Sequence, residues 1–333
     1  MSANTTFKAL VVEETSEKTF TKTIVERNIK DLPNNELVID VKYSSLNYKD
    51  AMSANGNKRI TQQYPHTPGI DAAGVVVSDE SGSFEPGQEV LVFGYDLGMN
   101  TAGGLGQKIS IPADWAVACP STLSLRESMI YGTGGVTAAL CIQKLEKMGM
   151  QPSQGKVAVT GATGGVGSIS VALLKQLGYE VVAFSGKPEK SDYLIKLGAS
   201  EVLHRDEINK VQDKPAGREL WANAIDTLGG DYLANLLKQV KSGGAVASCG
   251  LASSPMLSMT VLPFITRGIS LLGVDSVYIP LADKQAVWSR VASDMKLANL
   301  SSYCEEISLD QTPEYLDRFF KGQVVGRYLV KIS

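Results

Sequence analysis

A glycine-rich turn is the clearest group of residues with a chemical role. Residues 160–167 read TGATGGVG, which varies GxGxxG by placing alanine first. The turn follows an apolar strand pattern at 157–159 and opens a helical pattern at 166–177, which is the context a dinucleotide site requires. A bare backbone at Gly164 lets a pyrophosphate approach, a small Gly167 lets the helix cross the strand closely, and amides at the helix start donate to the anion. The alternative is a purely structural turn. The predicted phosphate-binding residues are Thr163, Gly164, Gly165, Val166 and Gly167.

The end of the next strand, at 181–184, indicates which dinucleotide binds. An NAD enzyme offers an acidic side chain there, about 20 residues beyond the glycines, to the ribose 2'-hydroxyl. This chain has Ser185, Gly186 and Lys187 instead, and Arg205 follows the next strand. A hydroxyl and two cations suit a 2'-phosphate, so these four residues favour NADPH over NADH. Incidental lysines at a solvated helix start are the alternative.

The pattern of elements changes near Pro120. Before it, short apolar alternations such as 37–41 and 74–77 predict antiparallel β-structure. After it, strands alternate with helices, which is typical of βαβ units and a doubly wound parallel sheet. A last strand, at 326–331, is predicted to return to the first domain. Six strands are predicted for the sheet, at 157–159, 181–184, 201–203, 224–226, 245–249 and 271–274.

Composition limits the partners. The chain has 333 residues, a net charge of −3 and 44% hydrophobic residues, so we expect a folded protein that does not bind nucleic acid. No apolar run is long enough to span a bilayer and no signal peptide is evident, which predicts no membrane association and a cytoplasmic location. Reduced thiols in the core, without metal or disulfide roles, are expected at Cys119, Cys141, Cys249 and Cys304.

Eight stretches carry a resemblance to a known family. They are residues 44–50 (SSLNYKD), 68–71 (PGID), 161–167 (GATGGVG), 224–227 (AIDT), 249–252 (CGLA), 263–265 (PFI), 273–277 (GVDSV) and 326–327 (GR). On these stretches the chain resembles the medium-chain dehydrogenase/reductase superfamily, and within it the zinc-free quinone oxidoreductase group and its acrylyl-CoA reductase branch. The resemblance implies an α/β fold in which a Rossmann doubly wound parallel sheet, residues 126–299, is inserted into a GroES-like β-barrel domain, residues 1–125 and 300–333.

The same resemblance allows a test for zinc. The positions of two zinc ligands in the alcohol dehydrogenases of the superfamily correspond to Asn47 and Ile70. The chain has only two histidines, His66 and His204, and no cluster of four cysteines, so no metal site is expected. Without a Lewis acid, oxidation of simple alcohols is not expected.

The resemblance also implies a reaction. NADPH would reduce the C=C bond of an α,β-unsaturated carbonyl, with acrylyl-CoA reduced to propanoyl-CoA as the leading reaction. An NADPH:quinone or enone oxidoreductase is the alternative, and a non-catalytic NADPH-binding sensor is the alternative of another class. Cations for the phosphates of CoA are sought at Lys49, Lys58 and Arg59, though such a run is also typical of a solvated face.

Further site residues come from the family pattern. Tyr48 is implied to lie beside the nicotinamide, either as a proton donor or as a ring packed against the cofactor, and Leu251, Ile265, Ser276 and Gln323 are implied to bind the nicotinamide half. Asp50 and Asp71 are expected to cap turns or pair with cations rather than act as acids. Arg327 is expected to tie down the last strand, with a substrate phosphate as the alternative partner.

Two further expectations concern packing. The branch has GTAGFTA where this chain reads GTGGVTA at 132–138, so the smaller Val136 is expected to loosen local packing between the domains and affect substrate preference. The apolar sheet edge at 270–274 predicts a homodimer formed by edge pairing.

Overall fold

The computed structural model describes residues 6–333, which divide into two compact units. The first unit runs through Gly134 and includes 277–292 and 299–333, and the second comprises 135–276 and 293–298. The predicted boundaries at 125/126 and 299/300 differ from this division, because segments near both of them pack with the first unit. Arg327, for example, donates from Nε to the Ile130 carbonyl at 2.9 Å.

The first unit contains a mostly antiparallel sheet of seven strands, as expected for a barrel domain. Its order is β14-β15-β3-β4-β5-β7, with β6 paired to β3. The C-terminal strand β15 lies between β14 and β3, with Leu329 opposite Ser45, so the predicted return of the last strand to the first domain is confirmed. These strands are β3 (Leu37–Ser45), β4 (Asp71–Asp79), β5 (Glu89–Phe93), β6 (Lys108–Ile111), β7 (Ala116–Ala118), β14 (Cys304–Ser308) and β15 (Arg327–Lys331).

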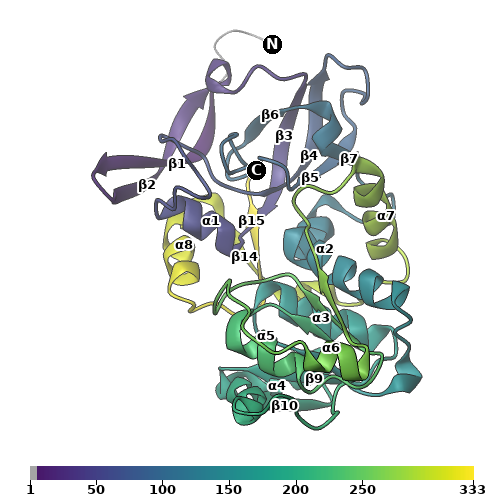
Figure 1. Ribbon diagram of the computed structural model, residues 1–333. Helices are drawn as coiled ribbons and strands as arrows, with labels where there is room; N and C mark the ends of the chain where they lie inside the picture. Colours follow the sequence, from purple (N-terminus) through teal and green to yellow (C-terminus); the bar gives the residue numbers. More distant parts are fainter. Residues whose placement is uncertain (1–5) are drawn as a thin grey trace. The chain divides into compact units, whose positions relative to one another are not determined.

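A separate hairpin and several helices complete the first unit (Figure 1). Strands β1 (Thr6–Ser16) and β2 (Thr19–Asn28) pair with each other in a two-stranded antiparallel sheet, and the backbone of β1 also donates to the Leu105 and His66 carbonyls. The remaining elements are α1 (Tyr48–Ala54), α7 (Leu281–Val291), α8 (Thr312–Phe320) and the start of α2 (Leu125–Lys147). Inside α2, Gly132 has φ 46° and ψ −159°, so the helix is broken there, just before the boundary between the units.

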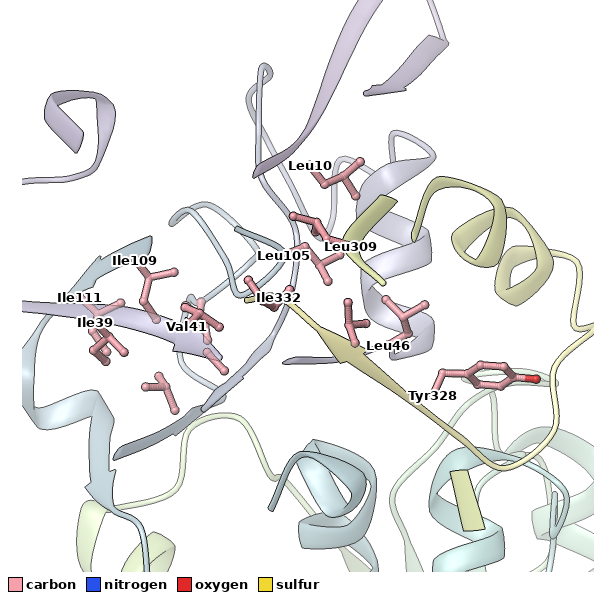
Figure 2. Close-up of a cluster of buried hydrophobic side chains, with 14 of the residues drawn as sticks. Leu10, Ile39, Val41, Leu46, Leu105, Ile109, Ile111, Leu309, Tyr328 and Ile332 are labelled. Atoms are coloured by element: carbon pink, nitrogen blue, oxygen red, sulfur yellow. The ribbon is translucent and has the colours of Figure 1, made fainter. Parts of the chain in front are cut away.

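The core of the first unit joins residues that are far apart in sequence. Figure 2 shows Leu10, Ile39, Leu105 and Ile332 among the buried side chains of this cluster. Alternate residues of β3 point into it, since Leu37, Ile39 and Val41 are fully buried. The core therefore depends on strands from both ends of the described chain.

The second unit contains a six-stranded parallel sheet in the order β10-β9-β8-β11-β12-β13, which confirms the predicted doubly wound fold. The chain builds outward from β8 to β10, then returns to the other side of β8 with β11. Its strands are β8 (Val157–Val159), β9 (Val181–Ser185), β10 (Glu201–His204), β11 (Asn223–Asp226), β12 (Ala245–Ser248) and β13 (Ser270–Gly273). Its helices are the second part of α2 with α3 (Gly165–Gln176), α4 (Ser191–Leu197), α5 (Gly230–Leu237) and α6 (Leu262–Arg267).

Glycines end two of these helices. Gly198 adopts φ 113° at the end of α4, and Gly178 adopts φ 86° one residue beyond the cap of α3. Both conformations are favourable only without a Cβ atom, so these glycines end their helices.

Within residues 6–333, every helix is too short or too polar to cross a bilayer. The four cysteines are free thiols. Only Cys141 is buried, while the other three are partly exposed, so the expectation of core positions holds for Cys141 alone.

Candidate functional site

The glycine turn between β8 and α3 has a backbone that larger side chains would not permit. Gly161 adopts φ 58°, and a Cβ atom there would lie 2.2 Å from Thr227 Oγ1. A Cβ atom at Gly167 would lie 2.4 Å from the Gly161 carbonyl oxygen, which explains the close crossing of helix and strand. Gly164 is exposed and caps α3, whose first N–H groups lack partners within the helix. The turn thus fits a pyrophosphate at the start of α3.

The end of β9 lies beside this turn. Thr163 Oγ1 and Ser185 Oγ are 3.4 Å apart, and the Lys187 backbone N–H donates to Ser185 Oγ at 3.0 Å. A Cβ atom at Gly186 would lie only 2.9 Å from Arg205 Nε, so glycine lets the guanidinium approach the backbone there. The structure therefore brings together the residues predicted to surround the phosphates of a dinucleotide.

The charges at this end of the sheet suit an anion. Arg205 begins a short 3₁₀ segment, its side chain is 48% exposed, and its guanidinium lies 5.5 Å from the centre of the Tyr232 ring. Partial burial lowers the pKa of Lys187 below its ordinary value. An ammonium group that has lost hydration gains from an anionic partner, so these two cations are well suited to a 2'-phosphate.

Three predicted residues of the nicotinamide half also lie in the second unit. Leu251 and Ile265 are 63% and 75% exposed, so both apolar side chains are accessible to a ligand. Ser276 Oγ accepts a hydrogen bond from Thr137 Oγ1 at 2.9 Å. Their contact with a cofactor remains a prediction.

Tyr48 stands at the start of α1 in the first unit, with 53% of its surface exposed. The helix start is held by Asp50, which accepts from the Asn47 backbone N–H at 2.8 Å and from the Ile70 N–H at 2.9 Å. Asp50 thus caps the turn, as expected, and leaves the Tyr48 phenol accessible.

Asp71 is fully buried and is the centre of a polar cluster. Its carboxylate accepts hydrogen bonds from the Ser45 hydroxyl, from Asn47 Nδ2 at 2.7 Å and from Thr133 Oγ1 at 2.6 Å. Arg327 NH2 lies 3.9 Å from the same carboxylate. Asp71 therefore pairs with a cation, as expected.

Arg327 ties the last strand to this cluster. It donates to Asn47 Oδ1 at 3.1 Å and to Ser45 Oγ at 2.7 Å, and it is only 2% exposed. A substrate phosphate is therefore not its partner. Ser45 and Thr133 were not identified from the sequence, where nothing but the nearby motifs distinguishes them.

The cluster contains two carboxylates and one guanidinium. Asp71 has several strong donors, whereas Asp50 has two backbone N–H groups and a like charge nearby. Burial, followed by repulsion from Asp71, raises the pKa of Asp50 to about 7. Asp50 is thus the member of the cluster that takes up a proton near neutral pH.

The other candidates of the first unit are less distinctive. Gln323 is exposed just after α8, where its backbone N–H donates to the Arg318 carbonyl at 2.9 Å. Lys58 is paired with Glu14 at 2.7 Å and lies 4.6 Å from the Tyr64 ring centre. Its use as a CoA-binding cation would require exchange of this ion pair.

Within the described residues, no group of three or more His, Cys, Asp and Glu side chains is arranged to hold a metal ion. At the two positions compared with zinc ligands, the Asn47 amide is engaged by Asp71 and Arg327, and Ile70 has no ligand atom. These two side chains do not fit a metal site.

Comparisons with known proteins agree with this architecture. Residues 33–121 match the alcohol dehydrogenase GroES-like domain, and residues 165–293 match the zinc-binding dehydrogenase domain. The acrylyl-CoA reductase AcuI of Ruegeria pomeroyi is 42% identical over 328 residues, covering 98% of this chain and 99% of its own.

Two solved structures have the same fold along the chain. The yhdH oxidoreductase of Salmonella enterica, in complex with NADP, is 44% identical with a TM-score of 0.95. The yhfP protein of Bacillus subtilis, with NAD bound, is 43% identical with a TM-score of 0.96. Each covers 98% of this chain and 100% of the solved chain.

Proposed function

Because the chain belongs to the medium-chain dehydrogenase/reductase superfamily, in its acrylyl-CoA reductase branch, we propose that it reduces acrylyl-CoA to propanoyl-CoA with NADPH. The similarity to AcuI over nearly the full length of both chains supports the substrate. A single structural observation supports NADPH as the cofactor. Ser185 lies beside the glycine turn, the Lys187 backbone is bonded to Ser185, and Arg205 lies beside Gly186. One relative holds NADP and another NAD, so the choice between them depends on these side chains.

Different residues of the chain bind different parts of the cofactor in this proposal. The turn at 163–167 binds the pyrophosphate, and the cations after β9 and β10 bind the 2'-phosphate. The bound NADPH supplies the hydride that reaches the β-carbon of the unsaturated thioester. Leu251, Ile265, Ser276 and Gln323 bind the nicotinamide half, where apolar side chains exclude water from the reacting atoms.

Tyr48 is proposed to hydrogen-bond the cofactor or the substrate, because its phenol is accessible and its backbone is held by the cap of α1. It is also the candidate proton donor to the α-carbon. Tyr48→Phe removes the hydroxyl and keeps the ring. A turnover number that falls while the Kd for NADPH is unchanged would support proton donation, whereas unchanged turnover would leave Tyr48 as a packing residue.

The function is tested by following NADPH consumption spectrophotometrically with acrylyl-CoA, a simple quinone and methyl vinyl ketone, and with NADH as the control cofactor. We expect kcat/KM for acrylyl-CoA to reach about 10⁴ M⁻¹s⁻¹ or more and to exceed the others. Faster turnover of the quinone would establish the quinone oxidoreductase instead. Tight NADPH binding without turnover of any of them would indicate the sensor.

We further propose that the chain forms a homodimer by pairing of β13, which is the edge strand of the second sheet. Exposed apolar side chains at Met256 and Val261 precede this strand and are suited to burial in an interface. Leu272→Lys should shift the mass measured by light scattering from dimer to monomer, while Lys196→Glu on α4 should not. A monomeric wild-type protein would refute the dimer. The cytoplasmic location stays a prediction.

A further inference from the structure

Asp226 ends β11 with a fully buried carboxylate that the reaction does not use. It accepts hydrogen bonds from Thr160 Oγ1 at 2.7 Å and from the Gly229 backbone N–H at 2.9 Å. The Leu228 N–H at 3.3 Å and Ser248 Oγ at 3.5 Å complete its shell. All four donors are neutral, so the carboxylate is held in place by hydrogen bonds and not by an ion pair with any of these groups.

The position of Asp226 in the sheet is special. Strand β11 lies between β8 and β12, and β8 and β11 are the neighbours at which the chain changes its direction of building. Ligands of doubly wound sheets bind outside the carboxyl ends of the strands at such a switch point. Asp226 is the last residue of β11 and lies at this end.

On one side, Asp226 and the next residue hold the beginning of the glycine turn. Thr160 donates its hydroxyl to Asp226, and its oxygen accepts from the Thr227 N–H at 3.0 Å. Thr227 Oγ1 in turn donates to the Thr160 carbonyl at 3.0 Å. The residue that opens the turn is therefore bonded through both its side chain and its backbone.

On the other side, the same segment holds the loop at 249–254, which carries Leu251. The Cys249 N–H donates to the Asp226 carbonyl at 3.0 Å, and the Ser253 N–H donates to the Leu228 carbonyl at 2.8 Å. The two segments lie so close that position 250 has no space for a side chain, because a Cβ atom at Gly250 would lie 2.2 Å from the Thr227 carbonyl oxygen.

We propose that Asp226 is a positioning residue that sets the glycine turn and the 249–254 loop at the spacing one dinucleotide requires. The inference rests on the proposed binding of NADPH. The adenosine side of that site, around Ser185 and Arg205, lies at the ends of β9 and β10, whereas the donors to the Asp226 carboxylate lie after β8, after β11 and on β12. Asp226 should therefore matter for a ligand that spans the pyrophosphate and nicotinamide halves, and not for one that binds the adenosine side alone.

Asp226→Asn tests this with a side chain of the same shape. The amide directs an N–H toward groups that are themselves donors, so at least one bond at the turn or at Gly229 is lost. We expect the Kd for NADPH to rise about tenfold or more. The Kd for adenosine 2'-monophosphate, which lacks the 5'-phosphate, the pyrophosphate linkage and nicotinamide, should change less than about twofold.

The measurement is calorimetric titration of the full chain with NADPH and with adenosine 2'-monophosphate. Asp231→Asn is the matched control, because Asp231 is exposed in the first turn of α5 five residues away, and both of its Kd values should equal those of the wild type. Thr160→Val removes the bond to Asp226 and the bond from the Thr227 N–H, and it should show the same selectivity if Asp226→Asn does not fold.

Three outcomes are separable. A selective loss of NADPH affinity supports the positioning role. Unchanged NADPH affinity in a folded Asp226→Asn protein, or equal loss for both ligands, overturns it and leaves the proposed function intact. A wild-type chain that binds neither ligand overturns the proposed function, and this inference with it.

Discussion

Lys284 on α7 is a lysine whose burial makes the stability of the first unit depend on pH. Its side chain is fully buried, its ammonium group donates to the Phe93 carbonyl, and it lies 3.4 Å from the centre of the Tyr95 ring. Burial lowers the pKa of Lys284 from 10.5 to about 7, although the charge of Asp114 opposes the shift. A charged amine in this position therefore opposes folding.

The sign and size of the effect follow from linkage. The folded pKa is lower than the unfolded one, so between about pH 7 and about pH 10 the unfolded chain binds more protons, and stability rises with pH. Each pKa unit corresponds to about 1.4 kcal/mol. With the shift above, the free energy of unfolding should gain about 2 kcal/mol from this group between about pH 7 and about pH 9.

Lys284→Met removes the titration and keeps most of the volume. The variant loses the hydrogen bond to Phe93, which costs about 1–3 kcal/mol at every pH and shifts its curve without changing its slope. The decisive quantity is therefore the difference in slope between wild type and variant. All other titrating groups contribute equally to both slopes, so they cancel in this difference.

The assay is urea unfolding at several pH values, in a Trp221→Phe background so that fluorescence reports the first unit through Trp115 and Trp288. Lys321→Met, at an exposed lysine just after α8, is the control and should keep the wild-type slope. Parallel curves for wild type and Lys284→Met would refute the reasoning, because they would mean that Lys284 titrates alike in both states.

Three further predictions concern the two candidate sites. The raised folded pKa of Asp50 should make the wild-type protein lose about 2 kcal/mol of unfolding free energy between about pH 5 and about pH 6.5. Asp50→Asn should remove this decline, and the same pH dependence of urea unfolding in wild type and variant over this range would contradict the prediction. Arg205→Ala should raise the Kd for NADPH about tenfold and leave that for NADH within about twofold, measured by fluorescence titration, and an equal loss for both would exclude a 2'-phosphate contact. Gly132→Ala should destabilise the first unit by about 2 kcal/mol or more in urea unfolding. The reason is that its Cβ atom would lie 2.4 Å from Ser45 Oγ and 2.6 Å from Asp71 Oδ2. A stability equal to that of wild type would show that the polar cluster around Asp71 moves to make room for the methyl group.

The second unit was predictable from sequence because its signals are local. Each strand of the parallel sheet is a short apolar run, and turn residues such as Gly178 and Gly198 follow the helices at once. The glycine turn at 160–167 is likewise contained in one strand-to-helix connection. Periodicity and turn chemistry therefore sufficed to predict six strands and their approximate limits.

The polar cluster of the first unit was not predictable in the same way. Ser45, Asp71 and Arg327 come from three distant parts of the chain, and only the pairing of β15 with β3 and of β3 with β4 brings them together. Thr133 joins them because α2 is broken at Gly132, a feature that its glycines alone do not indicate. Lys284 lies in α7, a helix of polar and apolar residues, and a lysine in such a helix is normally exposed.

The position of β15 between β14 and β3 has a consequence for the order of folding. During synthesis, β3 leaves the ribosome long before its partner Leu329 exists, so residues 43–45 of β3 lack their partners until β15 is made, whereas residues 37–40 can already pair with β6. The second unit, being nested at 135–276, can fold in the meantime and bring its two ends to fixed positions. Closing the barrel then requires the ordering of far fewer flexible residues than separate Ser45 from Leu329, which lowers the entropic cost of the last step. The insertion of one unit into the other thus makes folding of the inner unit a preparation for closure of the outer one.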